Sequence, residues 1–130
     1  IRADKTHTFM TGNRDAAAPP SRREIVATSI AKYAVGQVIH HRRFDYRGVV
    51  IDVDHRFHGT DTWYKQMATS SPPRDRPWYH VLVDDSDLRT YVAERNLELD
   101  HTGAPVNHPE VASYFSDLTP EGYVAREKSN

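Results

Sequence analysis

Two short segments of the chain are rich in arginine. The five residues concerned are Arg42, Arg43 and Arg47 in the first segment, and Arg74 and Arg76 in the second. Guanidinium groups can pair with nucleic-acid phosphates, or with acidic groups of a protein, if the fold brings both segments to one side. Asp45 and Asp75 interrupt the two clusters, however, which is also typical of a solvated loop rim. The five arginines are therefore candidates for contact with a nucleic acid or a protein partner.

Eight histidines are many for a chain of 130 residues and raise the question of a metal site. The sets to consider are His55 with His58, and His40 with His41 and His80. Adjacent residues of a strand point to opposite faces, so His40 and His41 do not chelate one ion together, and no HExxH motif is present. The chain also has no cysteine, which excludes thiolate ligands. The sequence predicts neither a metal site nor another cofactor.

Asp52 and Asp54 are the best candidates for acid–base chemistry. They lie two residues apart in an alternating stretch, and strand geometry places them on one face, about 7 Å apart. Paired carboxylates on the wet face of a strand more often keep a protein soluble or protect a sheet edge. No GxSxG nucleophile motif occurs either. We therefore expect no catalytic residues and a non-enzymatic protein.

The composition fits a single compact domain, with 38% apolar residues in 130. No apolar run approaches the roughly 20 residues of a membrane helix, and the lack of cysteine suits a reducing compartment. We expect a cytoplasmic protein that makes no membrane contact. The 17 Lys and Arg residues nearly balance 18 Asp and Glu residues, for a net charge of −1, so any contact with a nucleic acid must be local.

Five short stretches have the alternation of β-strands, namely residues 35–41, 48–55, 78–84, 89–93 and 97–99. In the second stretch, Val50 is expected to share a face with Asp52 and Asp54. The third is apolar on both faces, which indicates a central position in a sheet. Short helices are expected over residues 59–67, capped by Thr60 or Asp61, and over residues 108–115. The prolines of residues 70–77 predict an exposed loop.

These elements predict a mainly β fold: a small SH3-like, strongly bent five-stranded antiparallel barrel with one or two short helices. We expect residues 1–31 to be a flexible N-terminal arm, because they show no sustained periodicity. Residues 32–118 would form the barrel domain with a short C-terminal helix, and residues 119–130 a flexible tail.

Six stretches of sequence resemble those of a known family. They are VGQVIHHR (residues 35–42), FDYRGVVIDVD (44–54), RPWYHVLV (76–83), YVAERNL (91–97), GAPV (103–106) and HPEV (108–111). Together with Trp63, they resemble the HspQ family of bacterial heat-shock proteins, also described as YccV-like or hemimethylated-DNA-binding. The resemblance covers about residues 32–115. One departure is His55, which stands where the family commonly has a proline.

The resemblance implies an SH3-like β-barrel without catalytic activity. The leading hypothesis is a heat-shock accessory protein that binds a Lon-type ATP-dependent protease and modulates the degradation of selected or denatured proteins. The alternative is a module that prefers hemimethylated double-stranded DNA. A third hypothesis is a barrel that only forms homo-oligomers, through an exposed strand edge or through the short helix around Trp63. The candidate arginines would contact phosphate groups under the DNA-binding hypothesis and a protein partner under the protease hypothesis.

Overall fold

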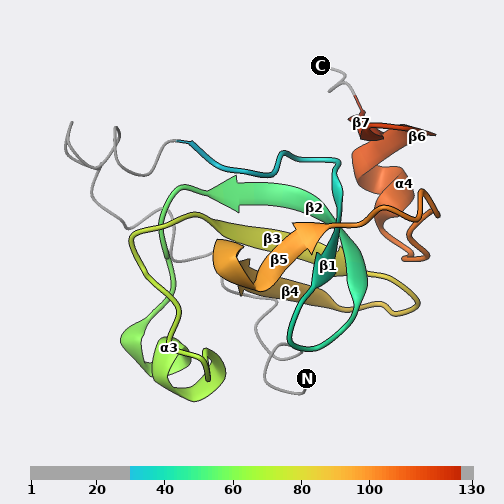
Figure 1. The fold of residues 1–130 in the computed structure, drawn as a ribbon. Coiled ribbons are helices and arrows are strands. Elements are labelled where there is room, and N and C mark those ends of the chain that lie inside the picture. Colours follow the sequence, from blue (N-terminus) through green and yellow to red (C-terminus); the bar gives the residue numbers. More distant parts are fainter. Residues whose placement is uncertain (1–29, 127–130) are drawn as a thin grey trace.

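The computed structural model describes residues 30–126, which form a bent five-stranded sheet and a two-stranded hairpin (Figure 1). The strands are β1 (Val38–His41), β2 (Arg47–Asp54), β3 (Trp78–Val83), β4 (Arg89–Ala93), β5 (Leu97–Leu99), β6 (Phe115–Thr119) and β7 (Gly122–Ala125). The helices are α3 (Asp61–Met67), α4 (Val111–Tyr114) and the 3-10 helix η2 (Glu94–Asn96). In this part of the chain, no helix is long and apolar enough to cross a membrane. The mainly β fold is thus confirmed.

The five-stranded sheet has the order β4-β3-β2-β1-β5, with antiparallel neighbours throughout. Strands β4 and β5 are its two edges and do not pair with each other, so the expectation of a closed barrel was wrong. The reason lies in the connection between these edges. The chain passes from β4 to β5 through η2, and this 3-10 turn bridges the open side where a ladder would be needed for closure.

Strand β2 contains a β-bulge at Ile51, which changes the faces expected from simple alternation. Val50 lies opposite Val81, but the next ladder pair is Asp52 with His80, so Ile51 is an extra residue. Beyond the bulge, Val53 packs against the same apolar cluster as Val50. The expectation that Val50 shares a face with Asp52 and Asp54 was therefore wrong. The two carboxylates lie on the opposite face of the sheet.

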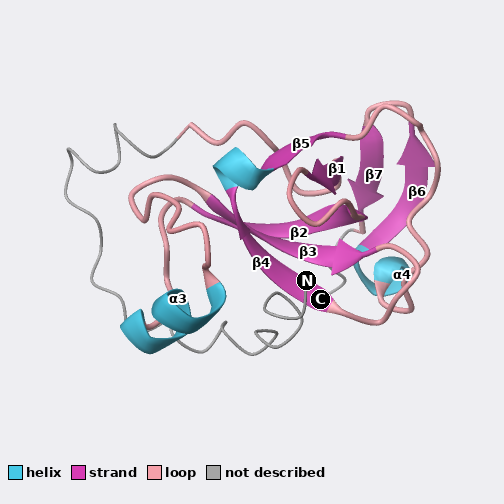
Figure 2. Ribbon diagram, turned by 60° about the horizontal axis from the view of Figure 1, so that its bottom comes forward, coloured by secondary structure: helices cyan, strands magenta, loops and turns pink. Residues whose placement is uncertain are grey.

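Apolar side chains cover both faces of the sheet. The inner cluster draws on all five strands and comprises Tyr33, Ile39, Val50, Tyr79, Val81, Val92 and Leu97. The outer face carries two clusters, which are Trp63, Trp78, Tyr91 and Ala93 beside α3, and Val49, Leu82, Val106 and Phe115 beside the C-terminal segment. Every residue of β3 is buried and the strand lies between β2 and β4, which confirms its predicted central position. Figure 2 shows α3 at one end of the sheet and α4 with the β6–β7 hairpin at the other.

Helix α3 begins as its sequence predicts. The Oγ1 atom of Thr60 accepts a hydrogen bond from the backbone N–H of Trp63 at 3.0 Å, which is an N-cap. Trp63 is buried, with its ring centroid 6.1 Å from that of Trp78. The following proline-rich loop is fastened by the Tyr64 hydroxyl, which donates to the carbonyl oxygen of Pro72. The loop thus holds α3 against the outer face of the sheet.

The C-terminal part of the described chain differs from the expectation. Helix α4 has only four residues, and the chain continues as the β6–β7 hairpin up to Ala125. The boundary expected after Leu118 therefore cuts through a folded hairpin. The hairpin docks by backbone contact, because the Tyr123 N–H donates to Gly36 O at 2.7 Å and a Cβ atom on Gly36 would lie 2.2 Å from Tyr123 O. Residues 1–29 and 127–130, with most of the expected arm, lie outside the described residues.

Candidate nucleic-acid interface

His41, which is buried, organises the loop between β1 and β2. Its Nδ1 atom accepts hydrogen bonds from the backbone N–H groups of Arg43 and Phe44, both at 3.1 Å. Its ring stacks on that of Phe44, with centroids 4.8 Å apart. Burial lowers the pKa of His41 to about 4, so the ring is neutral at pH 7 and Nδ1 remains an acceptor. The loop is thereby held in a turn that leaves Arg42 and Arg43 exposed.

His40 points away from His41, as predicted, and fastens the same loop from outside. Its Nε2 atom lies 2.6 Å from Asp45 Oδ1, and its Nδ1 atom lies 2.8 Å from Glu98 Oε2. A neutral imidazole carries one N–H, so donation to both carboxylates requires the protonated ring. The pKa of His40 is accordingly raised, mainly by the hydrogen bond to Asp45 and further by Glu98, against the opposing effect of burial. Both histidines therefore stabilise the loop between β1 and β2 through hydrogen bonds.

The 3-10 helix η2 connects this hairpin to the proline-rich loop. The Arg42 N–H donates to Asn96 O at 2.8 Å, and the Glu94 N–H donates to Pro77 O at 3.0 Å. The Tyr79 hydroxyl donates to the Glu94 carboxylate at 2.6 Å, which anchors the turn to the inner core. The two arginine-bearing segments are thus both hydrogen-bonded to the same short turn. This proximity is necessary if they are to contact one partner together.

Arg95 lies on η2 between the two segments and belongs to neither arginine cluster of the sequence. It is exposed, and its Nη2 atom donates to Ser70 O at 2.6 Å. Its position between two short strands did not mark it as part of either arginine cluster, because the contact depends on how the sheet bends. We call Arg42, Arg43, Arg76 and Arg95, all exposed, the arginine rim.

Arg74 is turned toward α3. Its guanidinium lies over the ring of Tyr64, 4.0 Å from the centroid, and pairs with Asp61 at 2.7 Å. Its side chain is still 42% exposed, so it remains within reach of a partner at the edge of the rim. Cation–π contact and the ion pair give Arg74 a second task, which is to join the proline-rich loop to the helix.

Arg47 has a different environment from the other candidates. Its guanidinium pairs with Asp84 at 2.9 Å and with Asp100 at 3.2 Å, and it donates to the carbonyl oxygens of Ala104 and Pro105. Burial lowers the pKa of Arg47, but hydrogen bonds and charge attraction from Asp100 and Asp84 outweigh that effect and raise it. The side chain is 19% exposed and links the start of β2 to the β3–β4 turn and to the segment that follows β5. The structure thus separates Arg47 from the arginine rim.

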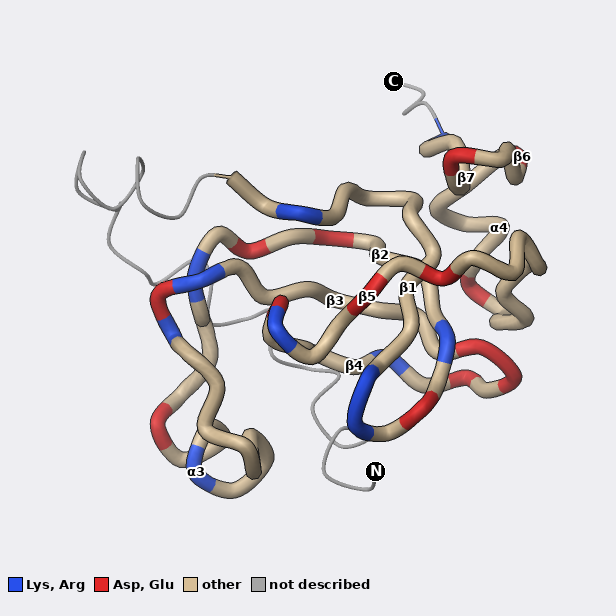
Figure 3. The backbone as a smooth tube through the Cα atoms, in the orientation of Figure 1, with Lys and Arg blue, Asp and Glu red and all other residues tan. Residues whose placement is uncertain are grey.

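Charge is unevenly distributed over the described residues (Figure 3). Arginines lie on the β1–β2 hairpin, on η2 and on the connection that leads into β3, each near an acidic residue, namely Asp45, Glu94 and Asp75 respectively. The β3–β4 turn is acidic, with Asp84, Asp85 and Asp87. Residues 42–46, 74–77 and 94–96 together contain five arginines and three acidic residues, so these segments have a small local excess of positive charge although the net charge of the chain is −1.

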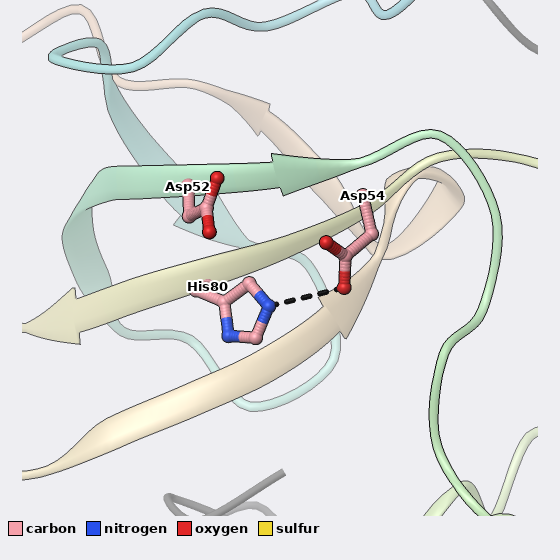
Figure 4. Close-up of side chains that lie close together, drawn as sticks. All are labelled: Asp52, Asp54 and His80. Atoms are coloured by element: carbon pink, nitrogen blue, oxygen red, sulfur yellow. Dashed lines mark hydrogen bonds and ion pairs between the residues drawn. The ribbon is translucent and has the colours of Figure 1, made fainter. Parts of the chain in front are cut away.

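A second group of polar side chains lies on the outer face of the sheet (Figure 4). Asp52 and Asp54 come from β2 and His80 from β3, and their nitrogen and oxygen ligand atoms all lie within 4.8 Å of one another. Asp54 Oδ2 is 3.1 Å from His80 Nε2 and accepts a hydrogen bond from the Tyr91 hydroxyl at 2.7 Å. Among the described residues, this group has the donor set for a metal ion. In the sequence, the aspartates and His80 fall into separate candidate sets.

The comparisons with known proteins agree with the resemblance. Residues 31–122 match the family model described as hemimethylated DNA-binding protein YccV like. The chain belongs to the YccV-like family. It is also similar to the F-box only protein 21 of Mus musculus, with 34% identity over 94 residues, and to that of Homo sapiens, with 33%. Each match covers 71% of this chain but only 15% of the relative.

Proposed function

We propose that this protein is a non-catalytic module that binds the phosphate backbone of double-stranded DNA through the arginine rim and prefers hemimethylated sites. The observation that carries the proposal is the pair of backbone hydrogen bonds by which η2 joins the β1–β2 hairpin to the proline-rich loop. These bonds join the backbone of the segments that carry the four exposed arginines. The YccV-like family description supports DNA as the partner and hemimethylation as the preference.

The number of arginines sets the expected salt dependence of binding. Each phosphate that a cation neutralises contributes about −0.9 to the slope of log K against log salt concentration. Four rim arginines therefore predict a slope of roughly −3 to −4. Because the whole chain carries a net charge of −1, affinity should be modest and should fall steeply as salt rises.

The direct test measures binding of the full chain to hemimethylated, fully methylated and unmethylated duplexes of one sequence over a salt series. We expect the hemimethylated duplex to bind most tightly and the salt slope to be similar for all three, since phosphate contacts carry no sequence information. Negligible binding to every duplex near physiological salt would refute the DNA proposal. Equal binding to all three would refute the hemimethylation preference alone.

Variants of the rim locate the contact surface. Arg43→Ala and Arg95→Ala should each weaken binding to every duplex and make the salt slope shallower by about 1. Lys65→Ala is the matched control, because Lys65 is an exposed cation on α3 outside the rim. If the control variant loses as much affinity as the rim variants, binding depends on the overall positive charge of the protein, and the proposal that the rim is the contact surface is wrong.

The second candidate is the accessory role in ATP-dependent proteolysis that the resemblance implies. Its support in the structure is a groove beside the edge strand β5, lined by the exposed aliphatic side chains of Leu99 and Leu118. Such a surface suits an extended protein segment with aliphatic side chains. The rate at which a purified Lon-type protease degrades a denatured substrate should rise when the chain is added, and Leu99→Ser should reduce that effect. An unchanged rate would refute this role.

A further inference from the structure

The Asp52, Asp54 and His80 group combines burial with a mixed donor set. The side chains of Asp54 and His80 are only 5% and 11% exposed, while Asp52 is half-buried and borders solvent. The group lies on the outer face between the apolar cluster beside α3 and the one beside the C-terminal segment. Two carboxylates and an imidazole thus meet in a largely buried place, where a metal ion could be bound by all three.

We propose that Asp52, Asp54 and His80 form a binding site for a divalent transition-metal ion, with Zn²⁺ as the best match. Donor atoms about 2.0–2.2 Å from one tetrahedral ion lie roughly 3.3–3.6 Å from each other. The three donors already lie within 4.8 Å, and Asp54 Oδ2 is 3.1 Å from His80 Nε2. Small rotations of the side chains therefore bring them to coordination distance without movement of the two strands.

The surroundings of Asp54 resemble the outer shell of a metal site. The Tyr91 hydroxyl donates to Asp54 Oδ2 and accepts a hydrogen bond from the His58 N–H at 3.0 Å. The Tyr91 ring also lies against His80, with centroids 4.5 Å apart. Hydrogen bonds of this kind orient ligands and are a common feature of protein metal sites. Tyr91 would thus hold two of the three ligands in place.

The donor types decide which ions are favoured. Imidazole suits Zn²⁺ and other transition ions, whereas Mg²⁺ and Ca²⁺ favour sites made of oxygen atoms. Three protein ligands leave a fourth position for water or for a group of a partner. That position would face the Asp52 side, where the group borders solvent. The site uses no residue of the arginine rim, so it stands or falls independently of DNA binding.

The test is isothermal titration of Zn²⁺ into the full chain after treatment with a chelator. One equivalent should bind, and tenfold excess Mg²⁺ should not compete. Asp52→Asn is the principal variant, because it keeps the shape of a half-buried side chain, and it should weaken Zn²⁺ binding at least tenfold. His80→Gln should do the same. Far-ultraviolet circular dichroism of each variant checks that the fold is retained.

The control variants are His55→Gln and His101→Gln, which remove exposed histidines outside the group. Both should bind Zn²⁺ as the parent chain does. Substitution with Co²⁺ provides a second readout, since visible absorption bands should appear in the parent chain and be lost in Asp52→Asn. The proposal is overturned if no equivalent of Zn²⁺ binds, or if Asp52→Asn binds Zn²⁺ and Co²⁺ as the parent chain does.

Discussion

The turn of the β1–β2 hairpin and the first residue of β2 carry the same kind of side chain in opposite settings. At the tip of the turn, Arg42 and Arg43 are exposed on a loop that the buried His41 holds in shape. At the start of β2, Arg47 is enclosed by two carboxylates and two carbonyl oxygens. Arginines four or five positions apart in one cluster therefore differ in role, since Arg42 and Arg43 are exposed and Arg47 is held in ion pairs. Proximity in sequence is a poor guide to whether a guanidinium is available to a partner.

The largest effect in this comparison is expected at the start of β2. Arg47→Met should lower the free energy of unfolding by about 3 kcal/mol, because Asp84 and Asp100 would lose their shared cation in a largely buried place. Urea denaturation measures the change, with Arg42→Met as the matched control at the tip. An equal decrease in the free energy of unfolding for Arg47→Met and Arg42→Met would contradict the difference between the two positions.

His41→Leu should have the next largest effect. Leucine fills similar space but leaves the Arg43 and Phe44 N–H groups without their acceptor, at a cost of about 2 kcal/mol. The variant should also weaken DNA binding, because the loop that presents Arg42 and Arg43 would lose its shape. Urea denaturation and duplex binding together test this link. Normal DNA affinity in a destabilised His41→Leu protein would show that DNA binding does not depend on the shape of this loop.

His40 should make the stability of the hairpin depend on pH. Its pKa is raised in the folded protein, so its contribution is complete below the unfolded value near 6.5 and is lost as pH rises through the folded pKa. The effect should be below about 1 kcal/mol, since the ion pairs with Asp45 and Glu98 are partly exposed. Unfolding measured between pH 5 and 9 should show this slope in the parent chain and a smaller one in His40→Ala. Identical profiles would contradict the assignment.

Arg43→Ala should have the smallest effect on stability, within about 0.5 kcal/mol, because the side chain is exposed. Its measurable effect should instead be on the salt slope of DNA binding. A loss of stability as large as that of Arg47→Met would show that the tip of the turn and the start of β2 do not differ. The same urea series measures it.

Local patterns in the sequence were sufficient for most of the secondary structure. The strands, the Thr60 cap of α3 and the opposite orientation of His40 and His41 follow from alternation and capping chemistry, which depend on neighbouring residues. The open edge of the sheet and the β6–β7 hairpin were not predicted. Both depend on contacts between distant segments, such as that of Gly36 with Tyr123.

The candidate sites show the same division. Exposure of the arginines at the hairpin tip was expected, but the enclosure of Arg47 needs Asp84 and Asp100, which lie 37 and 53 positions further along the chain. Arg95 joins the rim only because η2 crosses the open side of the sheet. The meeting of Asp52 and Asp54 with His80 depends on strand register and on a bulge that alternation does not reveal.

The bulge lets two successive residues of β2 lie on the outer face. Ile51 is the extra residue and packs against the cluster of Val49 and Leu82, while Asp52, the next residue, lies opposite His80. An in-frame loss of Ile51 would restore regular alternation and leave Asp52 opposite His80, so it would remove apolar packing and keep the polar group. A one-residue gap here in a homologous chain would therefore be compatible with the same three ligands.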